Sequence, residues 1–377
     1  MLEIVHLSAV HGRDDARIFD KQCRTLAARG HRVTLVVADG LGDTSRDGVA
    51  IVDAGARADG LKGLVAAARR IYLRALALRP DIVQLHHAAL LPLGPPLRRH
   101  GCKVVFDAGH DLPEPLPVPL RRARDAGPAS VAGEAWSRCA LAALWSRLER
   151  RACRRLDGVI AATPLVRDKF LAVNRATIDV SDFPVPDDVG AGLAWADKPV
   201  RVCHEGALSA IRGIVELVRA CELLQSPVRL SLAGDFSEGA LATRMLARPG
   251  WRRIDALGRL GRPGIGELRA SSRAGLITPH ATPGHLSAPP ATMFDYMAAG
   301  IPVIASDFPL WRAVVEAHAC GLCVDPRDPP AIAAAIDYLA SHPDIARRMG
   351  ENGRKAVCAR YNWPREAAKL IDFYEHL

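Results

Sequence analysis

The chain has 377 residues, of which 49% are hydrophobic and 24% are charged, and its formal net charge is +9. This length exceeds what one hydrophobic core usually supports, so we expect two domains, and the composition excludes a disordered or fibrous chain. No window of about 18 uncharged apolar residues occurs, which argues against a membrane-spanning helix.

The first half of the chain alternates short apolar runs with amphipathic segments. Asp14 or Asp15 can cap the first predicted helix, and Gly30 can end it. Short strands alternating with helices are typical of a parallel sheet covered on both faces. The predicted strands are 3–9, 32–38, 49–54, 81–87, 103–108 and 158–163, and the helices between them include 19–28 and 64–78.

Positive charge is concentrated near the end of this half. Residues 115–155 contain nine Arg and no Lys, against Asp125, Glu134 and Glu149. Nucleic acid could bind such a patch, but no aromatic RNA-binding signature or zinc finger accompanies it. An anionic membrane surface or a lipid-linked anionic substrate fits segment 121–155 better, and a solvated helix face is the alternative.

The pattern then restarts after a Pro- and Gly-containing stretch, 182–199. The predicted strands are 199–206, 228–234, 252–258, 274–279 and 301–306, and the helices include 214–224, 264–271, 328–342, 344–361 and 364–377. We therefore expect an α/β protein with two doubly wound Rossmann-like domains, 1–190 and 195–361. Ligands of such sheets bind at the carboxyl ends of the strands, here in a cleft between the domains.

Several expected signals are missing. The first loop, SAVHGRDDAR, is not a GxGxxG dinucleotide fingerprint, and there is no GxxxxGK[ST] phosphate loop. No close pair of acids follows an apolar strand, so neither a metal nor a cofactor is expected. Glu3 and an early break in the first apolar run argue against a signal peptide. The nine cysteines lack a framework spacing, which suggests reduced thiols in a cytoplasmic protein. The close pair Cys320 and Cys323 lacks a second pair for zinc, so we expect it to be structural.

Much of the chain resembles family 4 retaining glycosyltransferases of the GT-B fold. The similar segments include MFDYMAAGIPVIASDFPLWRAVVE, CGLCVDPRDPPAIAAAI, RRMGENGRKAV and LERRACRRLDGVIAATPLVRDKF. The N-terminal HLSAVHGRDDARIFDKQCRTLAARGHRVTLVVADG is similar to members that build bacterial surface polysaccharides. The resemblance implies that helix 362–377 packs back on the first domain. It also implies transfer of a sugar from a nucleotide-diphosphate donor to a lipid-linked or oligosaccharide acceptor at the cytoplasmic membrane face. The products would be lipopolysaccharide, O-antigen or exopolysaccharide.

The resemblance assigns the donor site to the second domain. Asp295, in the middle of an apolar helix, matches a family acid that holds the ribose hydroxyls. The other family acid position is occupied by Ser287, and a common family lysine is replaced by Thr292. Backbone N–H groups near Ala291 and Thr292 would receive the diphosphate. The alternative is that Asp295 is an acid on the exposed face of a helix.

A strand-to-helix turn, GALSAIRG, supplies further donor-side candidates. It begins at Gly206, and Ala207 stands where the family often has a first basic residue. Arg212 remains, and the resemblance implies that it stabilises the leaving diphosphate; alternatively it is a helix-start arginine with no ligand. Arg259, in the loop 258–263, would lie near the nucleotide base.

The acceptor side is expected in the first domain. In FDAGHDLPEP, Gly109 stands where relatives have a histidine, and Asp111 matches a family acid. His110 could replace that histidine if the turn shifts by one residue, or it could be a bystander. His86 matches another family histidine. His87 follows it on a strand end, so at most one of the two should face the cleft.

The loop after the first strand adds His11 and Arg13 as acceptor-side candidates. Arg13 could equally pair with Asp14 or Asp15. Two rival functions remain. A nucleotide-sugar epimerase would need a cluster of acids and histidines around one sugar, and the replacement of a family acid by Ser287 counts against it. A non-catalytic scaffold subunit is suggested by the replacements at positions 109, 207, 287 and 292.

Overall fold

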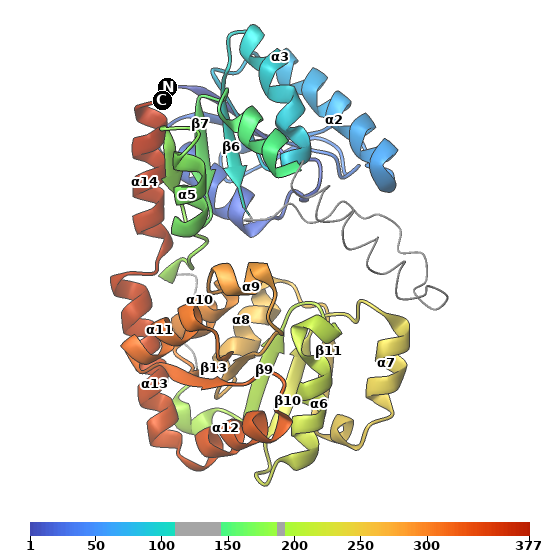
Figure 1. The fold of residues 1–377 in the computed structure, drawn as a ribbon, viewed down its shortest axis with the longest axis vertical. Helices are drawn as coiled ribbons and strands as arrows, with labels where there is room; N and C mark the ends of the chain where they lie inside the picture. Colours follow the sequence, from blue (N-terminus) through green and yellow to red (C-terminus); the bar gives the residue numbers. More distant parts are fainter. Residues whose placement is uncertain (110–144, 187–192) are drawn as a thin grey trace. The chain divides into compact units, whose positions relative to one another are not determined.

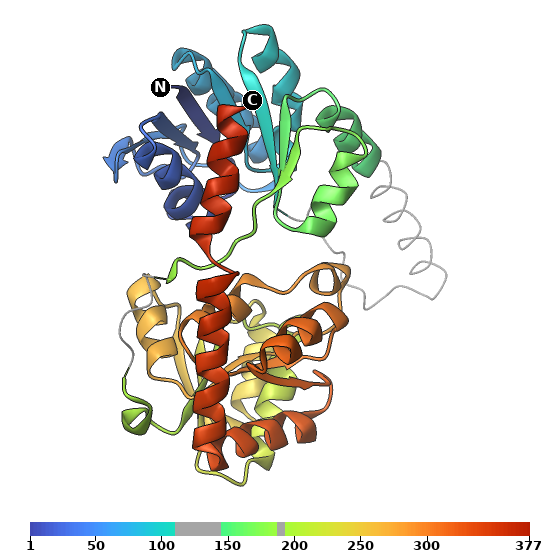
Figure 2. The same cartoon turned by 90° about the vertical axis from the view of Figure 1, so that its left-hand side faces the viewer.

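The computed structural model describes residues 1–109, 145–186 and 193–377 (Figures 1 and 2). The chain forms two compact units. Unit 1 comprises Met1–Asp182 and Glu366–Leu377, and unit 2 comprises Phe183–Arg365. The division therefore falls at Asp182, earlier than the predicted end at residue 190, and each unit is described on its own. No helix among the described residues is both long and apolar enough to cross a membrane.

Unit 1 contains an eight-stranded sheet in the order β3-β4-β2-β1-β5-β6-β7-β8. All neighbouring strands are parallel except β3, which runs antiparallel to β4. The strands are β1 (Glu3–Leu7), β2 (Arg32–Val37), β3 (Thr44–Arg46), β4 (Val49–Asp53), β5 (Ile82–Leu85), β6 (Lys103–Ala108), β7 (Gly158–Ala161) and β8 (Thr177–Asp179). The order reverses at β1, because β2 and β5 pair with its two sides.

Helices cover this sheet. Asp15 caps the first of them, since its Oδ1 accepts from the Ile18 N–H at 3.0 Å, and Gly30 follows the helix end with φ 93°. The first eight residues of this helix are wound as a π-helix, which the sequence did not predict. The helices with both ends described are η1 (Ala16–Cys23), α1 (Arg24–Ala28), α2 (Gly60–Ala77), η2 (Ala88–Leu93), α3 (Gly94–Arg99), α5 (Pro164–Leu171) and α14 (Trp363–Glu375). Residues 145–153 are helical as well.

Helix α14 lies against unit 1 in both views (Figures 1 and 2). The Tyr374 hydroxyl donates to the Gln84 side chain on β5, and Lys369 pairs with Asp179 on β8 at 2.8 Å. A Cβ placed on Gly158 of β7 would lie 2.4 Å from the Phe373 ring, so this glycine permits close approach of the helix. These contacts attach the end of the chain to three strands of unit 1.

Unit 2 is a six-stranded, wholly parallel sheet in the order β11-β10-β9-β12-β13-β14. The strands are β9 (Arg201–Glu205), β10 (Arg229–Ala233), β11 (Ile254–Gly258), β12 (Gly275–Ile277), β13 (Val303–Ser306) and β14 (Gly321–Val324). The helical segments are η4 (Trp195–Asp197), η5 (Ala210–Arg212), α6 (Ile214–Leu223), α7 (Gly239–Leu246), η6 (Pro249–Arg253), α8 (Arg262–Ala270), α9 (Pro283–Ser287), α10 (Ala291–Ala298), α11 (Pro309–His318), α12 (Pro329–Ser341) and α13 (Pro343–Ala359).

The two faces of this sheet carry separate cores. Val202 of β9 packs in the cluster that includes α6 and α12, whereas Cys203 packs in the cluster that includes α10 and α11. Successive side chains of a strand alternate between faces, so His204 lies on the α6 face and Glu205 on the α10 face. The order of the strands reverses at β9, which is where doubly wound sheets bind ligands. The predicted fold class, two doubly wound α/β units, is confirmed.

Candidate functional site

The turn that follows β9 is held closely against the segment after β12. The chain leaves β9 through Gly206 at φ 111° and enters α6 through Gly213 at φ 80°. A Cβ on Gly213 would lie 2.2 Å from the carbonyl oxygen of Thr278, so only glycine fits there. The backbone N–H of His280 donates to the carbonyl of Ile211 at 2.9 Å. The turn carrying the predicted donor residues is therefore fixed at the switch point of the sheet.

Arg212 lies at the end of η5 on this turn and is exposed. Within the part of the chain that the structure describes, its side chain makes no hydrogen bond or ion pair, although its backbone N–H donates to the Ser209 carbonyl at 3.0 Å. Its charge contributes to lowering the pKa of nearby His204, although burial is the larger cause and brings that pKa to about 4. An exposed guanidinium on a rigid turn is suited to contact an anionic ligand.

Asp295 lies on α10, and a second basic residue holds it. Its Oδ2 accepts from Nη2 of Arg269 on α8 at 2.9 Å. Arg269 also donates to Glu205 at the end of β9, from Nη2 to Oε1 at 2.6 Å and from Nε to Oε2 at 3.0 Å. The side chains of Asp295, Arg269 and Glu205 are 24%, 21% and 8% exposed. The acid in the apolar helix is thus part of an ion triad at the carboxyl end of β9.

The charges and burial of the triad shift the pKa values of Glu205 and Arg269. Burial raises the pKa of Glu205, and the negative charge of Asp295 acts in the same direction, while Arg269 opposes both. The pKa of Arg269 is raised, because the two carboxylates outweigh the effect of its burial. Sequence reasoning missed Glu205 and Arg269. The only signal in the sequence was an acid at the end of an apolar strand, RVCHE.

The start of α10 and the preceding helix hold three other predicted donor residues. Ala291 and Thr292 are the first two residues of α10, which has Pro290 at its N-cap and no side-chain cap. The first N–H groups of a helix have no partner within it, and the helix dipole favours negative charge there. Ser287 ends α9, and its hydroxyl donates to the Gly284 carbonyl at 2.8 Å.

Arg259 lies apart from the triad. It follows β11, the edge strand of the sheet, and its side chain is 85% exposed. It forms an ion pair with Asp235, which follows β10, at 3.3 Å. Glu205, which directly precedes Gly206, is therefore linked to Asp295 through Arg269. Arg259 instead lies at the edge of the sheet.

Unit 1 contains a buried polar network centred on Asp107, at the end of β6. Its carboxylate accepts from Arg17 at 2.8 and 3.2 Å, from Gln22 at 2.8 Å, and contacts His86 Nδ1 at 3.2 Å. Burial would raise the pKa of Asp107, but Arg17 and His86 hold it well below its usual range. His86 Nε2 lies 2.8 Å from Nδ1 of His6, and the two rings are stacked. The network ties β1, β5, β6 and η1 together.

The acceptor-side candidates have different surroundings. His86 is buried in this network, whereas His87 caps η2 by accepting from the Ala89 N–H at 3.1 Å. His11 lies 3.1 Å from Asp15. The sequence allowed an ion pair between Arg13 and Asp14 or Asp15, but neither pair forms. Arg13 forms a two-pronged ion pair with Asp39, at 2.7 Å for both bonds.

The reason for this correction is tertiary. Asp39 follows β2, which pairs with β1, so the loop after β1 meets it directly. Asp14 instead pairs with Arg46 at 2.8 Å. The predicted His110 and Asp111, and most of the Arg-rich segment 121–155, lie outside the described residues. Within the described ranges no group of three His, Cys, Asp or Glu side chains could hold a metal ion.

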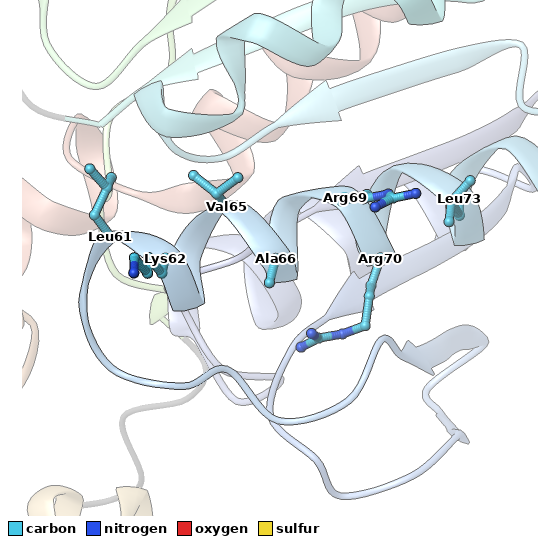
Figure 3. A pocket seen from close by; sticks show the side chains of 7 residues that line it. All are labelled: Leu61, Lys62, Val65, Ala66, Arg69, Arg70 and Leu73. Carbon is cyan, nitrogen blue, oxygen red and sulfur yellow. The ribbon is translucent and has the colours of Figure 1, made fainter.

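Helix α2 presents an exposed apolar stripe beside basic side chains (Figure 3). Leu61, Val65 and Leu73 are 63%, 61% and 56% exposed and recur along one side of the helix. Lys62, Arg69 and Arg74 are exposed, and the helix contains no acidic residue. Arg70 differs, because it donates to the backbone carbonyls of the loop 54–56. We name the surface formed by Leu61, Lys62, Val65, Arg69, Leu73 and Arg74 the α2 face.

Comparisons with known proteins agree with this architecture. The chain is 27% identical over 206 residues to a D-inositol 3-phosphate glycosyltransferase of Xylanimonas cellulosilytica, covering 52% of this chain and 49% of that protein. It is 41% identical over 76 residues, 20% of each chain, to a GDP-mannose-dependent alpha-(1-6)-phosphatidylinositol monomannoside mannosyltransferase of Mycobacterium tuberculosis. The chain thus spans about half the length, or less, of these curated relatives.

A solved structure extends the fold comparison over the whole chain. HepE of Anabaena, solved with UDP-glucose, has a TM-score of 0.73 at 14% identity and covers 100% of both chains. Two family models also match. Residues 16–180 match the glycosyl transferase 4-like domain, and residues 191–356 match glycosyl transferases group 1. The chain therefore carries a glycosyl transferase 4-like domain followed by a glycosyl transferases group 1 domain.

Proposed function

We propose that the protein is a metal-independent retaining glycosyltransferase. It moves a sugar from a nucleotide-diphosphate donor to a lipid-linked or oligosaccharide acceptor in bacterial surface-polysaccharide biosynthesis. The observation that carries this proposal is the carboxylate of Asp295, held at the carboxyl end of β9 in a unit that matches the group 1 domain. The names of the two curated relatives, which transfer sugars to inositol phosphate or to a phosphatidylinositol mannoside, support a phosphate-bearing or lipid-linked acceptor.

In this proposal unit 2 binds the donor. Asp295 accepts hydrogen bonds from the ribose hydroxyls, and the N–H groups of Ala291 and Thr292 receive the diphosphate. Gly206 lets the ligand approach the backbone, Ser287 contacts the transferred sugar, and Arg259 lies near the base. HepE was solved with UDP-glucose, which supports a nucleotide-sugar donor for this fold.

Arg212 is the proposed catalytic group of unit 2. The diphosphate departs from the face of the sugar on which the acceptor hydroxyl attacks, and negative charge develops on the leaving oxygen. A guanidinium that has no partner among the described residues can stabilise that charge without first breaking an ion pair. No cofactor besides the donor substrate enters this scheme.

Unit 1 is the proposed acceptor domain, with His11 and Arg13 near the acceptor. His110 as a catalytic group and Asp111 as an acceptor contact stay predictions. His86 is buried with Asp107, so we assign it to orienting the loops rather than to touching the acceptor. This assignment replaces the direct contact that the sequence suggested.

We further propose that unit 1 docks on the anionic inner face of the cell membrane. The α2 face supports this, because its exposed Leu61, Val65 and Leu73 can enter the lipid interface while its cations meet lipid phosphates. The Arg-rich segment 121–155 would add to the same attraction. The protein would then be cytoplasmic and peripheral.

Donor binding tests the proposal. Calorimetric titration with UDP, GDP and their sugar conjugates should show binding of one nucleotide, lost in Asp295→Ala. A folded protein that binds none of them would favour the scaffold, which the replacements Gly109, Ala207, Ser287 and Thr292 suggest. Conversion of the donor, without any acceptor, into a nucleotide-sugar with an altered sugar would favour the epimerase.

A further inference from the structure

We infer that Arg269 is a positioning residue that gives the donor site its selectivity for a ribose over a 2′-deoxyribose, and that Glu205 anchors it. The inference rests on the proposed function, because it concerns how Asp295 binds the donor. Neither Arg269 nor Glu205 was identified from the sequence. Their role follows from the contacts that join α8, β9 and α10.

The geometry places Arg269 between two acids. Its Nε and Nη2 both donate to Glu205, which lies at the end of β9 and is almost fully buried. The same Nη2 atom donates to Asp295 Oδ2 at 2.9 Å. A planar guanidinium that is held at two points has little freedom left. The orientation of the Asp295 carboxylate is therefore set by groups from two other elements.

The charges make this arrangement necessary for an ionised Asp295. One oxygen of each acid contacts the same nitrogen, so two negative charges lie close together in a partly buried site. Without the cation between them, one acid would take up a proton. The cation between them favours the ionised form of both acids, and the triad then carries one net negative charge. Hydroxyl groups bind an ionised carboxylate more strongly than a neutral acid.

The triad can therefore distinguish a ribose from a 2′-deoxyribose in the nucleotide. A ribose offers two adjacent hydroxyl donors to an oriented carboxylate, whereas 2′-deoxyribose offers only one. If Arg269 orients Asp295, its loss should weaken binding of the ribonucleotide, which uses two hydroxyl contacts, more than binding of the deoxynucleotide, which uses one. A purely structural ion pair would affect both ligands equally.

Equilibrium titrations of the full chain with UDP, 2′-deoxy-UDP, GDP and 2′-deoxy-GDP make the test. For the nucleotide that binds, the wild type should prefer the ribose form by about tenfold or more. Arg269→Met has similar length and no charge, and should reduce the preference to below about threefold. Arg269→Lys cannot bridge both acids and should reduce it nearly as much. Arg244→Met, a loss of one exposed charge on α7, is the matched control and should keep it.

Each outcome decides the inference. A preference retained in Arg269→Met, or equal losses for both sugars, would overturn it while the donor site stands. A wild type that binds the nucleotide without preferring ribose would remove both the Asp295 contact and this role of Arg269. A wild type that binds no nucleotide would overturn the proposed function and the inference together. If Arg269→Met does not fold, Arg269→Lys and Glu205→Gln, which weakens the anchor, give the same comparison.

Discussion

Replacing Asp107 with Asn should destabilise unit 1 strongly. The change keeps the size of the side chain but removes the charge that four hydrogen-bonding contacts from Arg17, Gln22 and His86 share. The amide NH2 would also face these donors instead of accepting from them. Arg17, whose side chain is 13% exposed, would become a buried cation without its counter-charge.

The magnitude follows from that unpaired charge. Removing one partner of a buried ion pair costs about 3–5 kcal/mol. Asn retains one acceptor oxygen, and Arg17 keeps its bond to the Val180 carbonyl, so we expect about 3 kcal/mol. The folded pKa of Asp107 is depressed, so its contribution is complete above the unfolded pKa of about 4. The difference from the variant should therefore be constant at neutral pH and shrink as the pH falls below about 4.

Urea unfolding, monitored by hydrogen exchange in peptides from β1 and β6, measures the stability of unit 1 separately from that of unit 2. Asp168→Asn is the matched control, because Asp168 is 61% exposed and pairs only at the surface with Arg167. It should cost less than about 1 kcal/mol. If Asp107→Asn costs no more than this control, the network is not what stabilises unit 1.

Three further predictions concern the turn, the catalytic arginine and the α2 face. Gly213→Ala should lower the stability of unit 2 by about 2 kcal/mol or more, because φ is 80° and the new Cβ would meet Thr278; an unchanged melting temperature would contradict this. Arg212→Ala should lower kcat more than tenfold and change the nucleotide Kd less than about threefold, and the reverse pattern would refute its transition-state role. Val65→Glu should reduce sedimentation with phosphatidylglycerol vesicles several-fold, whereas Leu246→Glu, at an exposed leucine of α7, should not. Equal binding of the wild type to neutral and to phosphatidylglycerol vesicles would argue against docking of the α2 face on an anionic membrane.

The regular elements could be predicted because their pattern is local. The strand β1 follows directly from the apolar run EIVHLSA. A cap at Asp14 or Asp15 follows from their place before a helix, and the structure selects Asp15. The strands β3 and β8 have three residues each, TSR and TID, and lack the apolar run that made the equally short β12 recognisable. The π-helical winding of η1 leaves no mark in residue types.

The site could be predicted only in part. Asp295 was identifiable because it stands in an apolar helix and matches the position of an acid in the family that the chain resembles. Its partner Arg269 lies 26 residues away along the chain, and Glu205 lies a further 64 residues from Arg269. Which of many arginines and acids pair over such distances depends on how α8 and α10 pack on the sheet. The pairing of Arg13 with Asp39 was missed for the same reason.

The central claim is that unit 2 binds a nucleotide-diphosphate sugar through Asp295. Calorimetric titration of the wild type and of Asp295→Asn with UDP and GDP tests it most directly. We expect one nucleotide to bind the wild type, and the variant to bind it about 10- to 100-fold more weakly, since a charged hydrogen-bond acceptor is lost. Equal affinity in the two proteins would contradict the ribose contact, and no binding of either nucleotide by the folded wild type would contradict the proposed function.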